Sequence, residues 1–333
     1  MVIEEVLNKK FMNKDLRKFC VAPMMGYTTP HARRLYRILS KRVFLFTEMV
    51  PSKTLINSTK KNLIIENNDQ NPIALQVGGS DYKDLIECAK IAQSYNYDEI
   101  NLNVGCPSKA VQKGNFGACL MKDKYLVREC LQSMIDNCDK EVTLKCRIGI
   151  NNQTSYNFFK EFISVVIQSG IKIIYVHARD AILSGLNPKN NRTIPPLKYD
   201  FVEKIKNDFP EVQFIINGGI KSLNQAYEFC KKYDGVMVGR LIQSNPFCLL
   251  DVDRIFFNEI INNKKYKSVV FEYFNYIKQK IGKDSIFRLL SPLLYIFFSV
   301  PNGKKFKNEI HEKIKNNEID KLENIFLDFI KQI

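Results

Sequence analysis

The sequence has few of the residues that commonly bind metal ions. It contains only three histidines, His31, His177 and His311, and none of its nine cysteines forms a Cys-x-x-Cys pair. Structural zinc sites use four such ligands at close spacing, so we expect no metal site. An odd number of cysteines without paired spacing is typical of the reducing cytoplasm. We therefore expect a cytoplasmic protein.

Long apolar runs are also missing. The most apolar stretch, 289–300, has 12 residues and includes Pro292, whereas a helix that crosses a bilayer needs about 20. The N-terminus carries Glu4, Glu5, Lys9 and Lys10 and lacks the apolar core of a secretory signal. We expect no membrane partner.

Acidic residues are scarce relative to basic ones. The chain has 50 Lys and Arg against 35 Asp and Glu, a formal charge of +15 that is spread along the sequence. One explanation is a polyanionic partner such as a nucleic acid. The other is a general richness in lysine, with many lysines only solvating helix faces. Charge alone supports both explanations equally.

The residues that are present indicate an α/β fold. Short runs of β-forming residues each precede a helical pattern, and this alternation is typical of a parallel sheet. Eight such units in about 240 residues fit a closed (β/α)₈ TIM barrel better than an open doubly wound sheet. The expected strands are 20–24, 44–47, 73–77, 99–102, 142–146, 173–176, 214–216 and 236–238.

The alternation ends near residue 240. Helical patterns alone follow, at 268–281, 286–298, 304–316 and 319–333. We therefore expect two domains, a barrel over residues 1–250 and an all-helical domain over residues 251–333.

Two glycine-rich turns predict a phosphate site. In TIM barrels the active site lies at the C-terminal ends of the strands, and Asn217-Gly218-Gly219 and Gly239-Arg240 follow the last two runs. Either turn alone could be a tight connection, but both at these positions favour backbone N–H groups that bind phosphate. Neither has the GxGxxG spacing of a dinucleotide fold or the spacing of a P-loop. We therefore expect FMN to supply the phosphate.

Lys145 ends an apolar run at the mouth of the expected barrel. Burying an unpaired cation there costs on the order of several kcal/mol, so we expect Lys145 to lie near the flavin and stabilise its reduced anion. Gln76 could bond the flavin edge, and His177 or Arg179 the phosphate or the substrate. A purely structural role for His177 is nearly as well supported.

Cys106 stands out among the nine cysteines. It lies in a Gly-Cys-Pro turn after the fourth run, before a long segment, 108–121, that is a candidate lid. A thiol ordinarily titrates at about pH 8.5 and so keeps its proton at neutral pH. A nucleophilic cysteine would want an adjacent base, and no histidine stands beside Cys106. We expect a proton donor.

Several motifs together carry a resemblance along nearly the whole chain. They are APMMGYTT (22–29), TEMV (47–50), ALQVGGSD (74–81), NLNVGCPS (101–108), GNFGACLM (114–121), LKCRIGI (144–150), VHAR (176–179), INGGI (216–220) and GVMVGR (235–240). In these motifs the chain resembles the tRNA-dihydrouridine synthases. The segment GLNPKNNRTIPPLKY (185–199) is similar to the signature of the DusA subfamily, which acts on positions 20 and 20a of the tRNA D-loop.

The resemblance implies a flavin-dependent oxidoreductase that acts on tRNA. NADPH (or NADH) would reduce FMN, the flavin would give a hydride to uracil C6, and Cys106 would protonate C5. The target base must leave its stack to reach a flavin, so the helical domain is expected to hold the tRNA. We expect a monomer. The residues implied to hold FMN are Pro23, Met24, Met25, Gln76, Lys145, His177, Asn217, Gly218, Gly219, Gly239 and Arg240. Those implied to face tRNA are Asn103, Arg179, Lys189, Arg192 and Arg288.

The chain departs from the DusA pattern near its C-terminus. It has Arg288-Leu289 and Lys304-Lys305-Phe306-Lys307 where those proteins usually show an Arg-His pair and a Gly-Ala-Arg segment. Lysine keeps the charge but loses the bidentate fork of arginine. Two alternatives remain, one of them from a different functional class. One is a pyrimidine oxidoreductase of the dihydroorotate dehydrogenase type, which would not explain the helical domain or the charge. The other is a non-catalytic RNA-binding barrel.

Overall fold

A closed parallel barrel forms the larger part of the molecule. The computed structural model describes residues 16–67, 69–151, 155–259, 266–297, 301–316, 318 and 321–332. The strand order is β1-β9-β8-β7-β6-β5-β4-β2, with β3 also paired to β4. A bridge between Cys20 of β1 and Phe44, next to β2, closes the sheet. The strands are β1 (Phe19–Val21), β2 (Leu45–Phe46), β3 (Val50–Pro51), β4 (Ile73–Gly78), β5 (Glu99–Val104), β6 (Glu141–Arg147), β7 (Ile173–His177), β8 (Gln213–Asn217) and β9 (Gly235–Val238).

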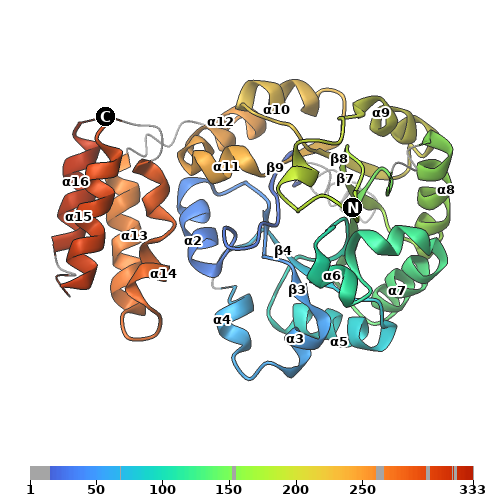
Figure 1. The fold of residues 1–333 in the computed structure, drawn as a ribbon, viewed down its shortest axis with the longest axis horizontal. Helices are drawn as coiled ribbons and strands as arrows, with labels where there is room; N and C mark the ends of the chain where they lie inside the picture. The colour runs from blue at the N-terminus through green and yellow to red at the C-terminus, as the bar shows by residue number, and fades with distance from the viewer. Residues whose placement is uncertain are drawn as a thin grey trace, which may run out of the picture.

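Helices surround the strands, as Figure 1 shows. Strand and helix alternate along the chain, so the expected TIM barrel is confirmed. The helices of this part are α2 (Pro30–Leu39), α3 (Ser52–Asn57), α4 (Lys61–Ile65), α5 (Tyr82–Ser94), α6 (Lys109–Lys113), α7 (Lys124–Asp136), α8 (Tyr156–Val166), α9 (Tyr199–Asp208), α10 (Leu223–Cys230), α11 (Arg240–Ser244) and α12 (Val252–Phe257). Short 3₁₀ turns are η1 (Gly117–Lys122), η2 (Ile167–Ser169), η3 (Asn190–Arg192) and η4 (Pro246–Asp251).

Strand β5 illustrates how the sequence divides between the two faces of the barrel wall. Side chains alternate along a strand, and Ile100, Leu102 and Val104 join the core between the strands and the helices. The intervening Glu99, Asn101 and Asn103 face the barrel interior, where their side chains hydrogen-bond to β4 and β6. The barrel interior is therefore polar along this side.

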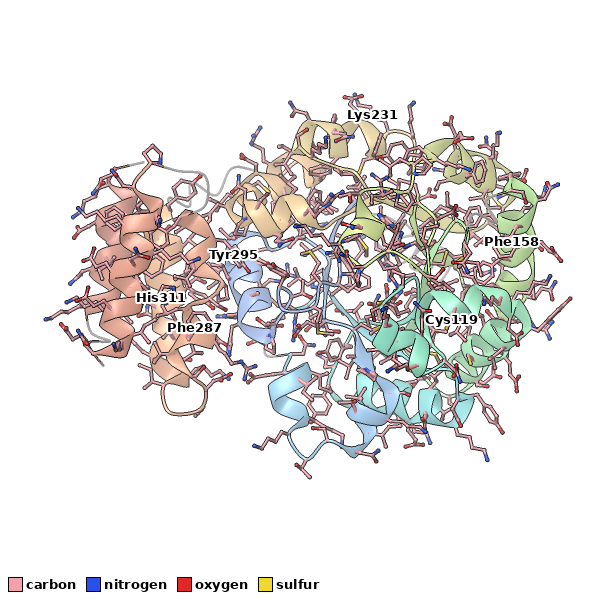
Figure 2. All side chains as sticks on the ribbon, in the orientation of Figure 1. Cys119, Phe158, Lys231, Phe287, Tyr295 and His311 are labelled. Atoms are coloured by element: carbon pink, nitrogen blue, oxygen red, sulfur yellow. The ribbon has the colours of Figure 1, made fainter. Side chains whose placement is uncertain are left out.

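A second group of helices packs beside the barrel next to α2 (Figure 1). It comprises α13 (Tyr266–Lys280), α14 (Ile286–Leu290), η5 (Leu293–Phe297), α15 (Gly303–Lys315) and α16 (Leu322–Ile330). Figure 2 shows Phe287 of α14 beside His311 of α15, and their rings stack with centroids 5.8 Å apart. The expected single helix over 286–298 is wrong, because it is interrupted between α14 and η5 at Pro292, which has no N–H to donate. Residue 298 itself lies outside the described residues.

Helix α12 lies just after the expected domain boundary at residue 250. Its Phe256 packs on Phe19 of β1, with ring centroids 4.8 Å apart, so α12 contacts the barrel. The division into residues 1–250 and 251–333 stays a prediction. Within the parts of the chain that the structure describes, no helix is long and apolar enough to cross a membrane.

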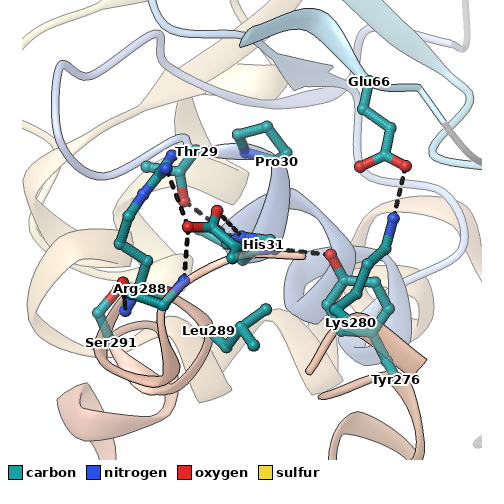
Figure 3. A network of polar contacts seen from close by, with 12 residues as sticks. Thr29, Pro30, His31, Glu66, Tyr276, Lys280, Arg288, Leu289 and Ser291 are labelled. Carbon is teal, nitrogen blue, oxygen red and sulfur yellow. Dashed lines mark hydrogen bonds and ion pairs between the residues drawn. The ribbon is translucent and has the colours of Figure 1, made fainter. Parts of the chain in front are cut away.

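A buried polar network joins α2 to the C-terminal helices (Figure 3). His31 of α2 lies 2.6 Å from the Tyr276 hydroxyl through Nδ1 and 3.0 Å from Asp284 Oδ2 through Nε2. Lys280 of α13 pairs with Glu66 at 2.6 Å. These contacts fix the helical group against the barrel.

Candidate active site

A large cavity opens at the C-terminal ends of the strands. Its volume of about 670 Å³ lies in the range typical of cofactor and substrate sites. Strands β1, β4, β5, β6, β7, β8 and β9 or the turns after them all contribute to its wall. The sequence-predicted residues on the wall are Pro23, Met24, Met25, Gln76, Asn103, Cys106, Lys145, His177, Arg192, Asn217, Gly218, Gly219, Gly239 and Arg240.

Three residues expected to face tRNA lie off this wall. Arg179 is buried, and its Nη1 donates to the carbonyl of Pro195. Arg288 lies on α14, where it is half exposed and pairs with Asp284 at 3.1 Å. Lys189 is not on the wall either, although its neighbour Pro188 is. The structure does not bring these three together with the cavity, and their roles stay predictions.

Lys145 enters the cavity from β6 without a carboxylate partner among the described residues. Its Nζ donates to Asn217 Oδ1 at 3.2 Å, and Asn217 is held in turn by a bond from its Nδ2 to the carbonyl of Met237. Burial, helped by the charge of Arg147, lowers the pKa of Lys145 to about 8. A half-buried cation with a neutral partner can bind an anionic ligand.

The pKa of His177 reflects the same excess of positive charge. Burial first, and then the charges of Arg147, Lys145, Arg179 and Arg240, lower the pKa of His177 well below its usual range. The imidazole is therefore neutral at physiological pH. This end of the cavity concentrates cations, and an anion bound there would relieve their mutual repulsion.

The turn after β8 packs closely against neighbouring side chains on the cavity wall. Gly218 and Gly219 have φ of +112° and +73°, a region that favours glycine. A Cβ on Gly218 would lie 2.6 Å from His177 Cδ2, and one on Gly219 would lie 2.7 Å from the Tyr199 hydroxyl. Only glycine fits at both positions.

Cys106 lies in a turn whose backbone is held by several hydrogen bonds. It is half-buried, and its backbone N–H donates to Asn103 Oδ1 at 2.9 Å. Its carbonyl accepts from the N–H of Ala118 at 2.9 Å. The candidate lid segment after it folds as α6 and η1, and a Cβ on Gly117 would lie 2.6 Å from the carbonyl oxygen of Cys106. The segment therefore packs directly on the cysteine turn.

Arg147 is a residue of this site that the sequence reasoning did not single out. Its Nε donates to the carbonyl of Gly105, and its Nη1 donates to the carbonyls of Asp180 and Asn191. One buried guanidinium thus ties the turn after β5 to two points of the connection between β7 and α9. Strand alternation supplies the signal that could have found it, since Lys145 and Arg147 share a face of β6.

Comparisons with known proteins agree on one family. The family model described as dihydrouridine synthase (Dus) matches residues 20–332. The chain is 41% identical over 297 residues to a tRNA-dihydrouridine(20/20a) synthase of Vibrio parahaemolyticus, covering 89% of this chain and 91% of that protein. It is 42% identical over 297 residues to the protein of the same name from Escherichia coli, covering 89% and 86%.

A solved structure described as a lactate oxidase from Pediococcus acidilactici is similar with a TM-score of 0.46 and 16% identity, covering 73% of this chain and 69% of that one. That likeness is too distant to bear on function. The family match over almost all of the chain, together with the two relatives, decides the question. The chain belongs to the dihydrouridine synthase family.

Proposed function

We propose that this chain reduces the C5–C6 double bond of uridine in tRNA to 5,6-dihydrouridine at positions 20 and 20a, with FMN in the barrel cavity and NADPH as the reductant. The observation that carries the proposal is the placement of Cys106 and a cationic, glycine-lined cradle on the walls of one cavity. The names of the relatives supply the substrate and the positions.

The residues present fit FMN. Gly218, Gly219, Gly239 and Arg240 all line the cavity, and backbone N–H groups of such turns with one guanidinium suit a phosphate group. Lys145 would then meet the flavin ring, and its unpaired charge would be balanced by the reduced anion. Pro23, Met24 and Met25, together with Gln76, would complete the enclosure. Bound FMN would supply the hydride that reaches uracil C6.

Cys106 would deliver the proton to C5. The reaction consumes one hydride and one proton, and we assign the proton to the Sγ–H of Cys106 on the cavity wall. The clamp on its turn keeps the thiol in place, which matters because proton transfer requires hydrogen-bond reach. Asn103 and Arg192, on the same wall, would hold the target nucleotide.

The tRNA would lie over the cavity mouth and the helical domain. In this proposal Arg179, Lys189 and Arg288 contact tRNA outside the cavity, and the charge of +15 draws the polyanion to the surface. We further propose a monomer that works in the cytoplasm, a compartment in which the nine free cysteines would stay reduced.

The replacement Cys106→Ala tests the proposal. We expect the purified chain to be yellow with flavin, and the variant to keep NADPH-dependent flavin reduction. Single-turnover dihydrouridine formation should fall by about two to four orders of magnitude, the usual worth of a general acid. The proposal would be contradicted if the wild-type chain bound no flavin, or if Cys106→Ala formed dihydrouridine as fast as the wild type.

Cys119→Ala is the matched control. Cys119 lies in η1 (Figure 2), is half-buried like Cys106, and donates to the carbonyl of Phe116 at 3.0 Å. It does not line the cavity, so its replacement should leave dihydrouridine formation unchanged.

A further inference from the structure

A continuous line of hydrogen bonds runs from the cysteine turn into the barrel interior. Asn103 Oδ1 accepts from the backbone N–H groups of Gly105 at 3.0 Å and Cys106 at 2.9 Å. Asn103 Nδ2 donates to Gln76 Oε1 at 2.8 Å, and Gln76 Nε2 donates to Asn101 Oδ1 at 2.7 Å. Gln76 and Asn101 are fully buried, so the bond between them is shielded from water.

The same line continues to a buried ion pair. Asn101 Nδ2 donates to Thr143 Oγ1 at 2.7 Å, and the Thr143 hydroxyl donates to Glu99 Oε1 at 2.6 Å. The other carboxylate oxygen, Oε2, accepts from Arg17 through Nη2 at 2.7 Å and Nε at 2.9 Å, and from the Tyr175 hydroxyl at 3.1 Å. Glu99 and Thr143 are fully buried.

Both ends of this line fix its direction. At the upper end the backbone N–H groups can only donate, so Asn103 must turn its oxygen toward them. At the lower end Arg17 can only donate, and the Thr143 hydroxyl must donate to the carboxylate of Glu99. Each amide between them is then left with one orientation, and a flip of any one would place two donors or two acceptors face to face. The two ends require the same direction.

We infer that Glu99, Thr143 and Asn101 are positioning residues of the active site, which act through Gln76 and Asn103 on the turn that carries Cys106. We call these five side chains the barrel relay. The first three do not line the cavity, whereas Gln76 and Asn103 do. For its effect on uridine reduction the inference rests on the proposed function; for the geometry of the turn it does not.

The relay also determines what Asn103 offers to a ligand. Its oxygen is used by two backbone N–H groups and one of its amide hydrogens by Gln76. The remaining polar group is a single N–H donor on the cavity wall. Asn103 can therefore donate to a carbonyl oxygen, which uracil and flavin both carry, but it cannot accept from an amino group. A flipped relay would reverse this preference.

Amide hydrogen exchange tests the inference without any substrate or cofactor. Thr143→Val keeps the shape of the side chain but removes the hydroxyl that links Asn101 to Glu99. We expect the amides of Gly105 and Cys106 to exchange about tenfold faster, because the bond that each makes to Asn103 is weakened when the relay is cut. Amides of α5, outside the relay, should exchange as in the wild type.

Two further variants separate positioning from general destabilisation. Thr143→Ser restores a hydroxyl and should return exchange at Gly105 and Cys106 to the wild-type rate. Ser169→Ala removes another buried hydroxyl, which donates to the carbonyl of Val166 at 2.7 Å and is not part of the relay. This variant should leave exchange of the cysteine turn unchanged.

Asn101→Leu cuts the relay at a second point, and the turn should respond as it does in Thr143→Val. The inference is overturned if Thr143→Val or Asn101→Leu leaves amide exchange of Gly105 and Cys106 unchanged. It is also overturned if the amides of α5 exchange faster by the same factor in both variants. Dihydrouridine formation should fall together with the faster exchange. If exchange responds and the wild-type chain forms no dihydrouridine, the proposed function fails while the relay stands.

Discussion

At the scale of single residues, the lowered pKa of Lys145 predicts that ligand binding is coupled to proton uptake. Burial holds the pKa of Lys145 at about 8, so at about pH 9 most of the free protein carries it neutral. An anion bound beside Lys145 raises that pKa, and binding should take up about one proton at this pH. At about pH 7 Lys145 is already charged and should take up almost none. Calorimetry of FMN binding in buffers of different ionisation enthalpy measures this number.

Lys145→Arg is the control for this prediction. Arginine keeps the positive charge but stays protonated across this pH range. The variant should bind FMN with the proton uptake at about pH 9 greatly reduced. Proton release by the wild type, or the same uptake in the variant, would show that Lys145 does not meet the anion.

Residues of the site could be predicted from the sequence where they stand at the end of an expected strand. Cys106, Lys145 and the Gly218-Gly219 turn follow apolar runs, and all lie on one cavity wall. The partners of Glu99 could not be predicted, because Arg17 lies 82 residues away in sequence and meets it only when the barrel closes. The tRNA contact expected of Arg179 has no support in the cavity, since this side chain folds back on Pro195.

At the scale of elements, the contact between α2 and the C-terminal helices depends on the tautomer of His31. Nε2 faces the Asp284 carboxylate and must carry the hydrogen, which leaves Nδ1 to accept from the Tyr276 hydroxyl. The neutral ring thus satisfies both partners. Burial lowers the pKa of His31 against the opposing pull of Asp284.

This lowered pKa predicts a loss of stability on acidification. Free histidine titrates at about pH 6.5, and the folded protein takes up this proton only at a lower pH. Between the two values the unfolded state binds more protons, so the free energy of unfolding falls as pH falls through about 6.5. In His31→Gln, denaturant unfolding at about pH 7.5 and pH 5.5 should give a smaller difference in free energy than in the wild type.

Tyr276→Phe separates titration from packing. It removes one hydrogen bond to His31 and should lower the free energy of unfolding by about 1 kcal/mol. It keeps the histidine, so the dependence on pH should survive. If His31→Gln retains the full dependence on pH, then other groups, such as His177, account for it.

The elements themselves were largely predictable, because strand and helix patterns are local. The eight expected runs all contain or overlap strands of the barrel. The helix expected over 286–298 is interrupted at Pro292, because the residue before a proline disfavours helical backbone even within an apolar pattern. The contact between α2 and the turn that joins α13 to α14 depends on tertiary packing, since His31 and Asp284 are 253 residues apart and no local pattern of either predicts the other.

At the scale of the whole molecule, the salt dependence of tRNA binding distinguishes the two explanations for the charge of +15. If basic side chains contact tRNA phosphates, binding releases counterions, and the dissociation constant rises steeply with salt. About six contacts would weaken binding roughly a thousandfold between about 50 and 200 mM salt. A general richness in lysine predicts a much shallower dependence.

One arginine tests whether tRNA contacts the C-terminal helices, as we propose. Arg288 is half exposed on α14, beside the exposed ring of Phe287, and its pairing with Asp284 leaves part of the guanidinium fork open to a phosphate. Arg288→Ala should reduce the slope of log affinity against log salt by about one. Lys231→Ala is the control, because Lys231 directly follows α10 at the outer edge of the barrel (Figure 2) and is paired with Glu228 at 2.7 Å. Equal slopes of log affinity against log salt for the two variants would show that Arg288 does not contact tRNA. An arginine contributes to this slope only when it binds a phosphate.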